Sequence, residues 1–133
     1  MIEKEREVEA KVLLCINTLL EKKAKDIIVI NIKELSSFTD YFVICSGTSD
    51  RQVKALASFI QESLKKSGIL PLGVEGATYG KWVLIDYDDV VVHIFQETVR
   101  AFYDLERLWP EAPRMAISDD TTEVTSLDQS LSC

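Results

Sequence analysis

The chain has 133 residues, of which 47% are hydrophobic and 28% charged, and its net charge at pH 7 is -7. This length supports one domain with a hydrophobic core, and the composition is typical of a globular protein rather than one that spans or enters a membrane. An acidic surface repels phosphate groups, which argues against direct, sequence-specific nucleic-acid binding. The same charge is compatible with a basic protein partner.

We expect a cytoplasmic protein. Residues 1–25 mix glutamates with lysines, which is not the pattern of a secretory or organellar leader. The three cysteines, Cys15, Cys45 and Cys133, form no C-x-x-C pair, and two of them lie in apolar runs. Such cysteines are typical of free thiols in a reducing compartment, with no disulfide and no metal role.

The first elements are a helix and two strands. Residues 1–25 have apolar side chains at helical spacing, which predicts an amphipathic helix. The residues that form its apolar side are Val8, Val12, Ile16 and Leu19 or Leu20. Residues 26–32 and 41–45 are rich in β-branched and aromatic residues, and each run predicts a strand.

Residues 50–66 predict a second helix. Ser49 and Gln52 have the spacing of a capping box, and Gly68 supplies a left-handed end. A loop or short strand follows at 71–74. We expect the strands on either side of this helix to be parallel neighbours, because a helical crossover joins parallel strands.

Residues 81–95, KWVLIDYDDVVVHIF, predict a β-hairpin at the centre of a sheet, because both apolar arms are rich in β-branched or aromatic residues. The acidic turn at 86–89 joins the arms, and aspartates are common turn formers. His93 lies within the second arm, where a lone histidine is more often a structural hydrogen bonder than a catalytic base.

Residues 97–109 predict a last helix that ends before Pro110. The remainder, 114–133, is rich in Ser, Thr and Asp, and we interpret it as a disordered acidic C-terminal tail after a single domain at 1–113. The order of elements predicts an α/β fold with a mixed β-sheet flanked by helices.

Candidate catalytic groups are few. Asp86 and Asp88 offer oxygen ligands to Mg²⁺, which leaves a Mg-dependent nucleotidyltransferase as an alternative function. However, metal-binding pairs in those enzymes alternate along one strand, whereas these aspartates lie at a turn. Gly47 and its neighbours before the second helix lack the lysine and the glycine spacing of a phosphate-binding loop. We therefore expect no catalysis, no cofactor and no metal site.

Four blocks together resemble the ribosomal silencing factor family, also called the Iojap-like proteins. They are TDYFVICSGTSDRQVKALA at 39–57, VEG at 74–76, WVLIDYDDVVVHIF at 82–95 and RAFYDLERLW at 100–109. The resemblance covers residues 8–110, so the tail inherits no role. A glycine commonly stands in the family where this sequence has Asp88.

The resemblance implies a fold related to nucleotidyltransferases but without their catalytic set. It also implies a homodimer that binds ribosomal protein fourteen of the large ribosomal subunit, blocks association with the small subunit and represses translation. Aromatic anchors within a charged rim are the expected contact pattern. The candidate contact residues are Asp40, Tyr41, Glu75, Trp82, Asp86, Tyr87, Asp88 and Tyr103.

Overall fold

The computed structural model describes residues 2–131. Its helices are α1 (Ile2–Glu21), α2 (Asp50–Lys66) and α3 (Glu97–Tyr103), and two short 3-10 helices follow, η1 (Leu105–Leu108) and η2 (Gln129–Leu131). Its strands are β1 (Lys25–Asn31), β2 (Tyr41–Gly47), β3 (Gly73–Glu75), β4 (Trp82–Asp86), β5 (Val90–Gln96) and β6 (Arg114–Ile117). The predicted elements before residue 97 are therefore present, each within a few residues of its expected bounds.

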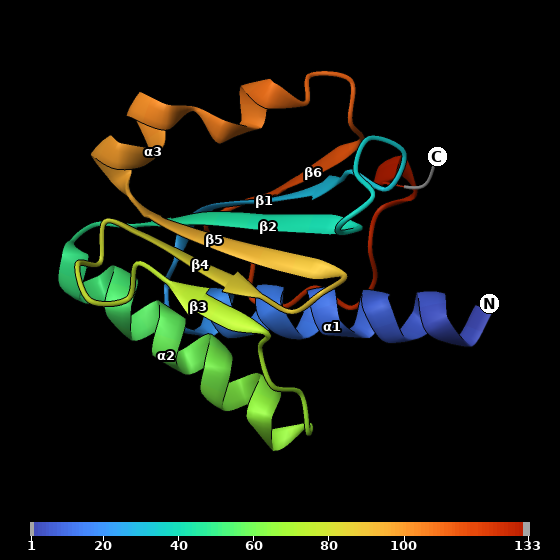
Figure 1. The fold of residues 1–133 in the computed structure, drawn as a ribbon, viewed down its shortest axis with the longest axis horizontal. Coiled ribbons are helices and arrows are strands. Elements are labelled where there is room, and N and C mark those ends of the chain that lie inside the picture. The colour runs from blue at the N-terminus through green and yellow to red at the C-terminus, as the bar shows by residue number, and fades with distance from the viewer. Residues whose placement is uncertain (1, 132–133) are drawn as a thin grey trace.

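The six strands form one sheet in the order β3-β4-β5-β2-β1-β6, with β2 and β5 parallel and the other neighbours antiparallel. This confirms the predicted mixed sheet with flanking helices (Figure 1). The prediction that the strands on either side of α2 are parallel neighbours is wrong. The chain leaving α2 runs past the sheet centre to β3 at the edge, and β4 and β5 bring it back to β2.

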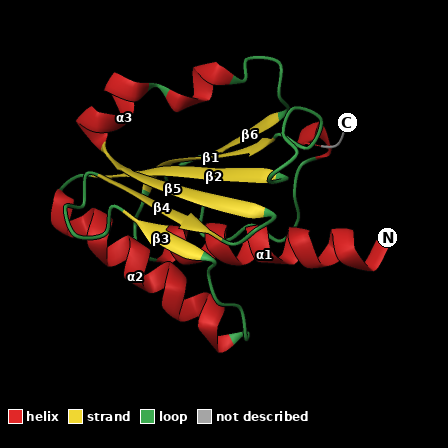
Figure 2. Cartoon of the chain, in the orientation of Figure 1, coloured by secondary structure: helices red, strands yellow, loops and turns green. Residues whose placement is uncertain are grey.

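The larger core lies between the sheet and the two long helices, which both cover the same face (Figures 1 and 2). Alternate residues of β5, namely Val90, Val92 and Ile94, pack there against the apolar sides of α1 and α2. Cys15 and Cys45 belong to this core as free thiols, and burial raises the pKa of each to about 12. The predicted burial of these two cysteines is confirmed, and Cys133 lies outside the described residues.

Helix α2 begins with half of the predicted capping box. The Ser49 hydroxyl accepts a hydrogen bond from the Gln52 backbone N–H at 3.1 Å. The Gln52 side chain turns back one residue further than expected and accepts from the Thr48 N–H at 2.6 Å. At the other end Gly68 adopts a φ of +79°, as a left-handed cap requires.

The opposite face of the sheet holds a smaller core around Phe95, under α3 and η1. The predicted helix at 97–109 is interrupted here, because Asp104 adopts a left-handed conformation with φ 49° and ψ 52°. The Asp104 N–H still bonds to the Arg100 carbonyl at 2.8 Å, and an ion pair of 2.7 Å between Arg100 Nε and Glu106 Oε1 spans the break. The change of direction places Leu105 in the small core, where it is 8% exposed.

The segment after Arg114 is ordered, so the prediction of a disordered tail is wrong for 114–131. Strand β6 pairs with β1 and extends the sheet. Further on, the Asn17 side chain bonds both the N–H and the carbonyl of Val124, each at 2.8 Å. Leu131 is 1% exposed. Isolated apolar residues suffice because they fill a core that the rest of the chain has already formed.

The turn between β4 and β5 is tight and depends on Asp88, whose φ is +75°. The Asp86 carboxylate accepts a hydrogen bond from the Asp88 N–H at 2.8 Å, and the Asp89 N–H donates to the Tyr87 carbonyl at 3.0 Å. A positive φ favours glycine, which accounts for the glycine expected at this place in the family. Lys11 of α1 holds the turn through a 2.7 Å ion pair with Asp89.

Candidate functional site

Part of the second sheet face is left uncovered by α3. Leu84 of β4 and Val91 of β5 point to this face and remain half-buried, whereas Phe95 beside them is fully buried. A hollow of about 420 Å³ lies here. We call its lining the open face, and it consists of Ser36, Phe38, Thr39, Phe42, Glu75, Leu84, Asp86, Val91, His93 and Trp109.

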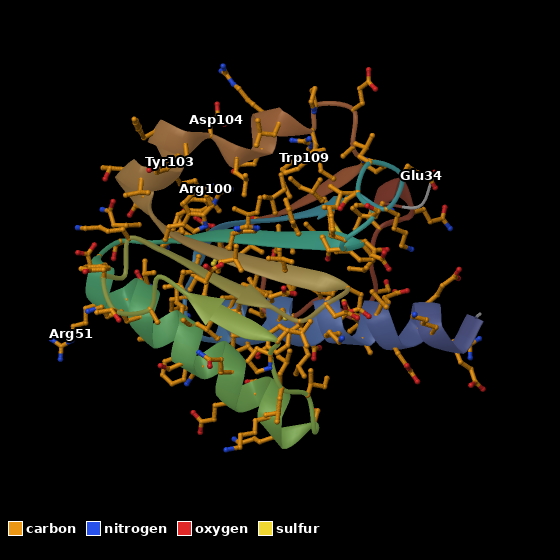
Figure 3. The ribbon with its side chains drawn as sticks, viewed as in Figure 1. Glu34, Arg51, Arg100, Tyr103, Asp104 and Trp109 are labelled. Atoms are coloured by element: carbon orange, nitrogen blue, oxygen red, sulfur yellow. The ribbon has the colours of Figure 1, made fainter. Side chains whose placement is uncertain are left out.

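Trp82 stands at the border between the open face and α3. Its ring stacks on Phe95 with centroids 4.7 Å apart and contacts the Tyr103 ring at 5.1 Å. Tyr103 is 59% exposed, and with Trp82 it lines a second hollow of about 400 Å³ next to Tyr79. Tyr103 and Trp109 both lie in the layer on the α3 side of the sheet (Figure 3). Aromatic side chains therefore extend along one side of the molecule.

His93 forms the polar floor of the open face. Its Nδ1 accepts a hydrogen bond of 3.1 Å from Trp82 Nε1, which confirms the structural role predicted for this histidine. Burial lowers the pKa of His93 from 6.5 to about 4, so the imidazole is neutral near pH 7. Since Nδ1 is the acceptor, the proton resides on Nε2. Nε2 has no hydrogen-bond partner among the described residues.

The charge of the open face is negative. Glu75 ends β3 and is exposed, and Asp86 ends β4 and is half-buried. Glu75 is paired with Leu84 across β3 and β4, and Leu84 is paired with His93 across β4 and β5, so these side chains share one side of the sheet. Asp86 lies two residues after Leu84 in β4 and is therefore on the same side. A cation that approaches this surface meets two carboxylates and a neutral imidazole.

The structure brings together four of the predicted contact residues, Glu75, Trp82, Asp86 and Tyr103, around the open face and its border. Tyr41 and Tyr87 are different, because they are 7% and 2% exposed and belong to the larger core on the other side. Their side chains do not reach the surface, so we correct the prediction that they are aromatic anchors. Tyr41 begins β2 and Tyr87 directly follows β4, and each lies next to a residue, Phe42 or Asp86, that faces the other side of the sheet.

Asp40 and Asp88 lie near the turn between β4 and β5. The Asp40 N–H bonds to the Asp89 carbonyl at 3.0 Å, which ties the loop before β2 to that turn. Asp88 is exposed at the turn itself. These two residues can act as an outer acidic rim, but neither lines the hollow of the open face.

The arrangement of Asp86 and Asp88 bears on the enzyme alternative. Asp86 ends β4, while Asp88 lies in the turn and donates its N–H to the Asp86 carboxylate. The two carboxylates do not alternate along one strand as a nucleotidyltransferase pair would. Within residues 2–131 no group of three or more His, Cys, Asp or Glu side chains is placed to hold a metal ion.

Another hollow, of about 510 Å³, lies beneath α3 beside Arg100. Arg100 bonds to the Ser46 hydroxyl at 2.9 Å and to the Asp26 carbonyl, and it forms the ion pair with Glu106. Nη1 makes both bonds to the sheet, one to β1 and one to β2, while Nε holds Glu106 of η1, so the guanidinium fastens α3 and η1 to the sheet. We therefore interpret Arg100 as a structural clamp.

Reasoning from the sequence missed the other members of the open face, above all Phe42, Thr39 and Trp109. The strand at 41–45 is apolar at nearly every position, so its sequence did not show which residues face each side. The alternation of β4 places Trp82, Leu84 and Asp86 on one face, and this signal could have identified Leu84 but no residue outside β4.

None of the helices described within residues 2–131 is long and apolar enough to cross a bilayer. The fold and the open face define an α/β protein with a mixed sheet, two helices on one face, and an aromatic surface edged with acids on the other. A family model described as "Ribosomal silencing factor during starvation" matches residues 5–131. The chain belongs to the ribosomal silencing factor family, and the resemblance found in the sequence is confirmed.

Individual relatives agree with this assignment. The ribosomal silencing factor of Halalkalibacterium halodurans is 40% identical over 104 residues, which cover 78% of this chain and 89% of that protein. A crystal structure from Chromobacterium violaceum is 39% identical, with a TM-score of 0.74, and the match covers 85% of this chain and 95% of that one. A mouse protein named "Mitochondrial assembly of ribosomal large subunit protein 1" is 28% identical over 135 residues, covering 86% and 59%.

Proposed function

We propose that this protein is a translational repressor that binds the large ribosomal subunit through ribosomal protein fourteen and blocks association with the small subunit. It does so as a binding protein, without catalysis. Membership of the silencing factor family supports the role, and the name of the mouse relative supports the large subunit as the target. The observation that carries the proposal for this chain is the open face, an aromatic surface that its own helices leave uncovered.

The physical character of the open face suits a basic ribosomal protein. The chain carries a net charge of -7, which raises the encounter rate with a positively charged partner and helps to fix its orientation. Affinity requires an apolar centre, because rim charges contribute little once they are solvated. Trp82 and Tyr103 supply that centre beside Phe42, and Glu75 and Asp86 supply the charges next to it.

Binding and inhibition are tested with purified ribosomal subunits. The unaltered protein should sediment with large subunits and should reduce the formation of complete ribosomes when small subunits are added. Failure to sediment with the large subunit, or normal subunit joining with the protein in excess, would refute the proposal.

Two variants locate the interface. Trp82→Ala and Asp86→Arg should each weaken sedimentation with the large subunit by at least about tenfold, the usual effect of removing an interface anchor or reversing a central charge. Phe59→Ala and Glu21→Arg are matched controls, because they make the same kinds of change on α2 and α1, on the far side of the sheet. If the controls weaken binding as much as the variants, the interface lies elsewhere.

Location and self-association are further parts of the proposal. We propose that the protein acts in the cytoplasm and forms a homodimer, and the exposed side chains of Phe102 and Leu108, 74% and 65% accessible, support an additional contact surface on α3 and η1. Sedimentation equilibrium at several concentrations measures the stoichiometry. The relation of this fold to nucleotidyltransferases stays a prediction.

A further inference from the structure

Two buried polar atoms of the open face lack partners. Thr39 Oγ1 and His93 Nε2 are both inaccessible to solvent and have no hydrogen-bond partner among the described residues, and both side chains line the hollow of about 420 Å³. Thr39 is 7% exposed and His93 4% exposed. Folded proteins rarely leave such atoms unpaired, and where they do the group often serves a ligand or an ordered water.

The chemistry of these two atoms is defined by their surroundings. His93 Nε2 carries its proton because Trp82 Nε1 occupies Nδ1, so it can only donate. The Thr39 hydroxyl can donate or accept. The hollow therefore offers one fixed donor and one adaptable hydroxyl, and a hydrogen-bond acceptor satisfies both.

The rim of the same hollow carries two carboxylates and therefore attracts a positively charged group. When ionised, Glu75 and Asp86 can accept hydrogen bonds but cannot donate them, and a Lys or Arg side chain pairs with them. Phe42 and Trp109 contact each other with ring centroids 4.9 Å apart and form an aromatic wall on which a guanidinium can stack. A ligand that fits this hollow presents a hydrogen-bond acceptor to the floor and a cation to the rim. A short segment of a basic protein has both groups.

Access to the floor requires a small movement of aromatic side chains. The Phe42 ring packs edge-on against His93 with centroids 4.6 Å apart. Phe38, which also lines the hollow, is 88% exposed, so little packing restrains it. Side-chain rotations of this kind are common when protein interfaces form.

We infer that the hollow is the polar recognition site of the open face, and that it takes a backbone carbonyl or side-chain amide oxygen next to a Lys or Arg of the protein partner. The oxygen accepts from His93 Nε2 and from the Thr39 hydroxyl, while the cation pairs with Asp86 and Glu75. This inference rests on the proposed function, because it specifies the chemistry that the ribosomal partner must present to the open face.

The test uses the unpaired state of Thr39 in the free protein. Thr39→Val removes the hydroxyl and keeps the shape of the side chain. Because no hydrogen bond among the described residues is lost, the variant should melt at the same or a higher temperature, yet it should bind purified large subunits roughly five- to tenfold more weakly. Thr39→Ser keeps the hydroxyl and should keep the affinity.

Thr18→Val is the matched control, since the Thr18 hydroxyl is bonded internally, at 2.8 Å to the Leu14 carbonyl and at 3.0 Å to the Ser63 hydroxyl. This control should melt at a lower temperature and bind large subunits as tightly as the unaltered protein. Stability and affinity should therefore change in opposite ways in the two valine variants.

Each of the remaining outcomes counts against the inference or against the proposed function. Equal affinity of Thr39→Val and the unaltered protein, or weak binding by Thr39→Ser, overturns the inference while the proposed function stands. A lower melting temperature for Thr39→Val also overturns it, because a water or a side chain then already bonds to that hydroxyl. If the unaltered protein fails to bind large subunits, the proposed function falls first and this inference falls with it.

Discussion

The burial of His93 should make the stability of this protein depend on pH between about 6.5 and 4. The unfolded chain takes up a proton on His93 below about pH 6.5, whereas the folded protein does so only near pH 4. Stability is therefore complete above pH 6.5, falls as the pH drops from 6.5 to 4, and receives no further change from this group below pH 4. Each tenfold difference in proton affinity is worth about 1.4 kcal/mol, so we expect a loss of about 3 kcal/mol across the window.

The free energy of unfolding is measured by urea denaturation at a series of pH values, with tryptophan fluorescence as the signal of unfolding. His93→Gln is the comparison, because it removes the titrating group and keeps an oxygen that can accept from Trp82 Nε1. His93 is the single histidine of the chain, and the carboxylates are common to both proteins, so the difference between the two stability curves isolates it. Parallel curves between pH 6.5 and 4 would show that the imidazole is not held neutral by burial.

Three further changes test the packing. Leu105→Ala should lower the free energy of unfolding by about 2–3 kcal/mol, because Leu105 is 8% exposed in the small core; a smaller loss in a denaturant titration would mean that η1 is not anchored there. Gly76→Ala should cost about 2 kcal/mol or more, since its φ is +82° and a β-carbon would meet the Trp82 carbonyl oxygen at 2.0 Å; unchanged thermal melting would contradict this backbone geometry. A chain shortened to 1–113 should lose at least about 3 kcal/mol, because Ile117 and Leu131 leave the core, and equal stability by calorimetry would restore the disordered tail.

The central elements of this fold can be predicted from the sequence because several local signals coincide there. The two arms of the hairpin at 82–95 are apolar and β-branched, and the turn between them is acidic, so pattern and turn chemistry agree. Helix α2 has a serine cap at one end and Gly68 at the other. Where the signals agree in this way, the structure contains the expected element.

The differences arise where a tertiary contact decides the local conformation. Asp104 breaks the last helix although its neighbours favour helix, and the compensating bonds come from Arg100 and Glu106. Strand β6 is only four residues long and exists because β1 offers it an edge. Neither effect is visible in a window of a dozen residues.

The open face was only half predictable for a similar reason. Trp82 and Asp86 could be chosen from the family blocks, but the membership of Phe42 and Trp109 depends on which residues α3 covers. Tyr41 in β2 and Tyr87 just after β4 were expected at the surface but lie in the core, because an aromatic residue in or beside a strand is a surface anchor or a core residue according to the side that it faces. That side is set by the register of neighbouring strands.

The parallel pairing of β2 with β5 has a consequence for how the chain folds. Strands β1 and β2 form one local antiparallel unit, and β3, β4 and β5 form another, each built from neighbours in the sequence. The seam between the units pairs Tyr41 with Val90, so it closes only after α2 and the second unit have formed. Such long-range closure is slow relative to hairpin formation. The middle of the finished sheet is thus expected to assemble after the two units on either side of it.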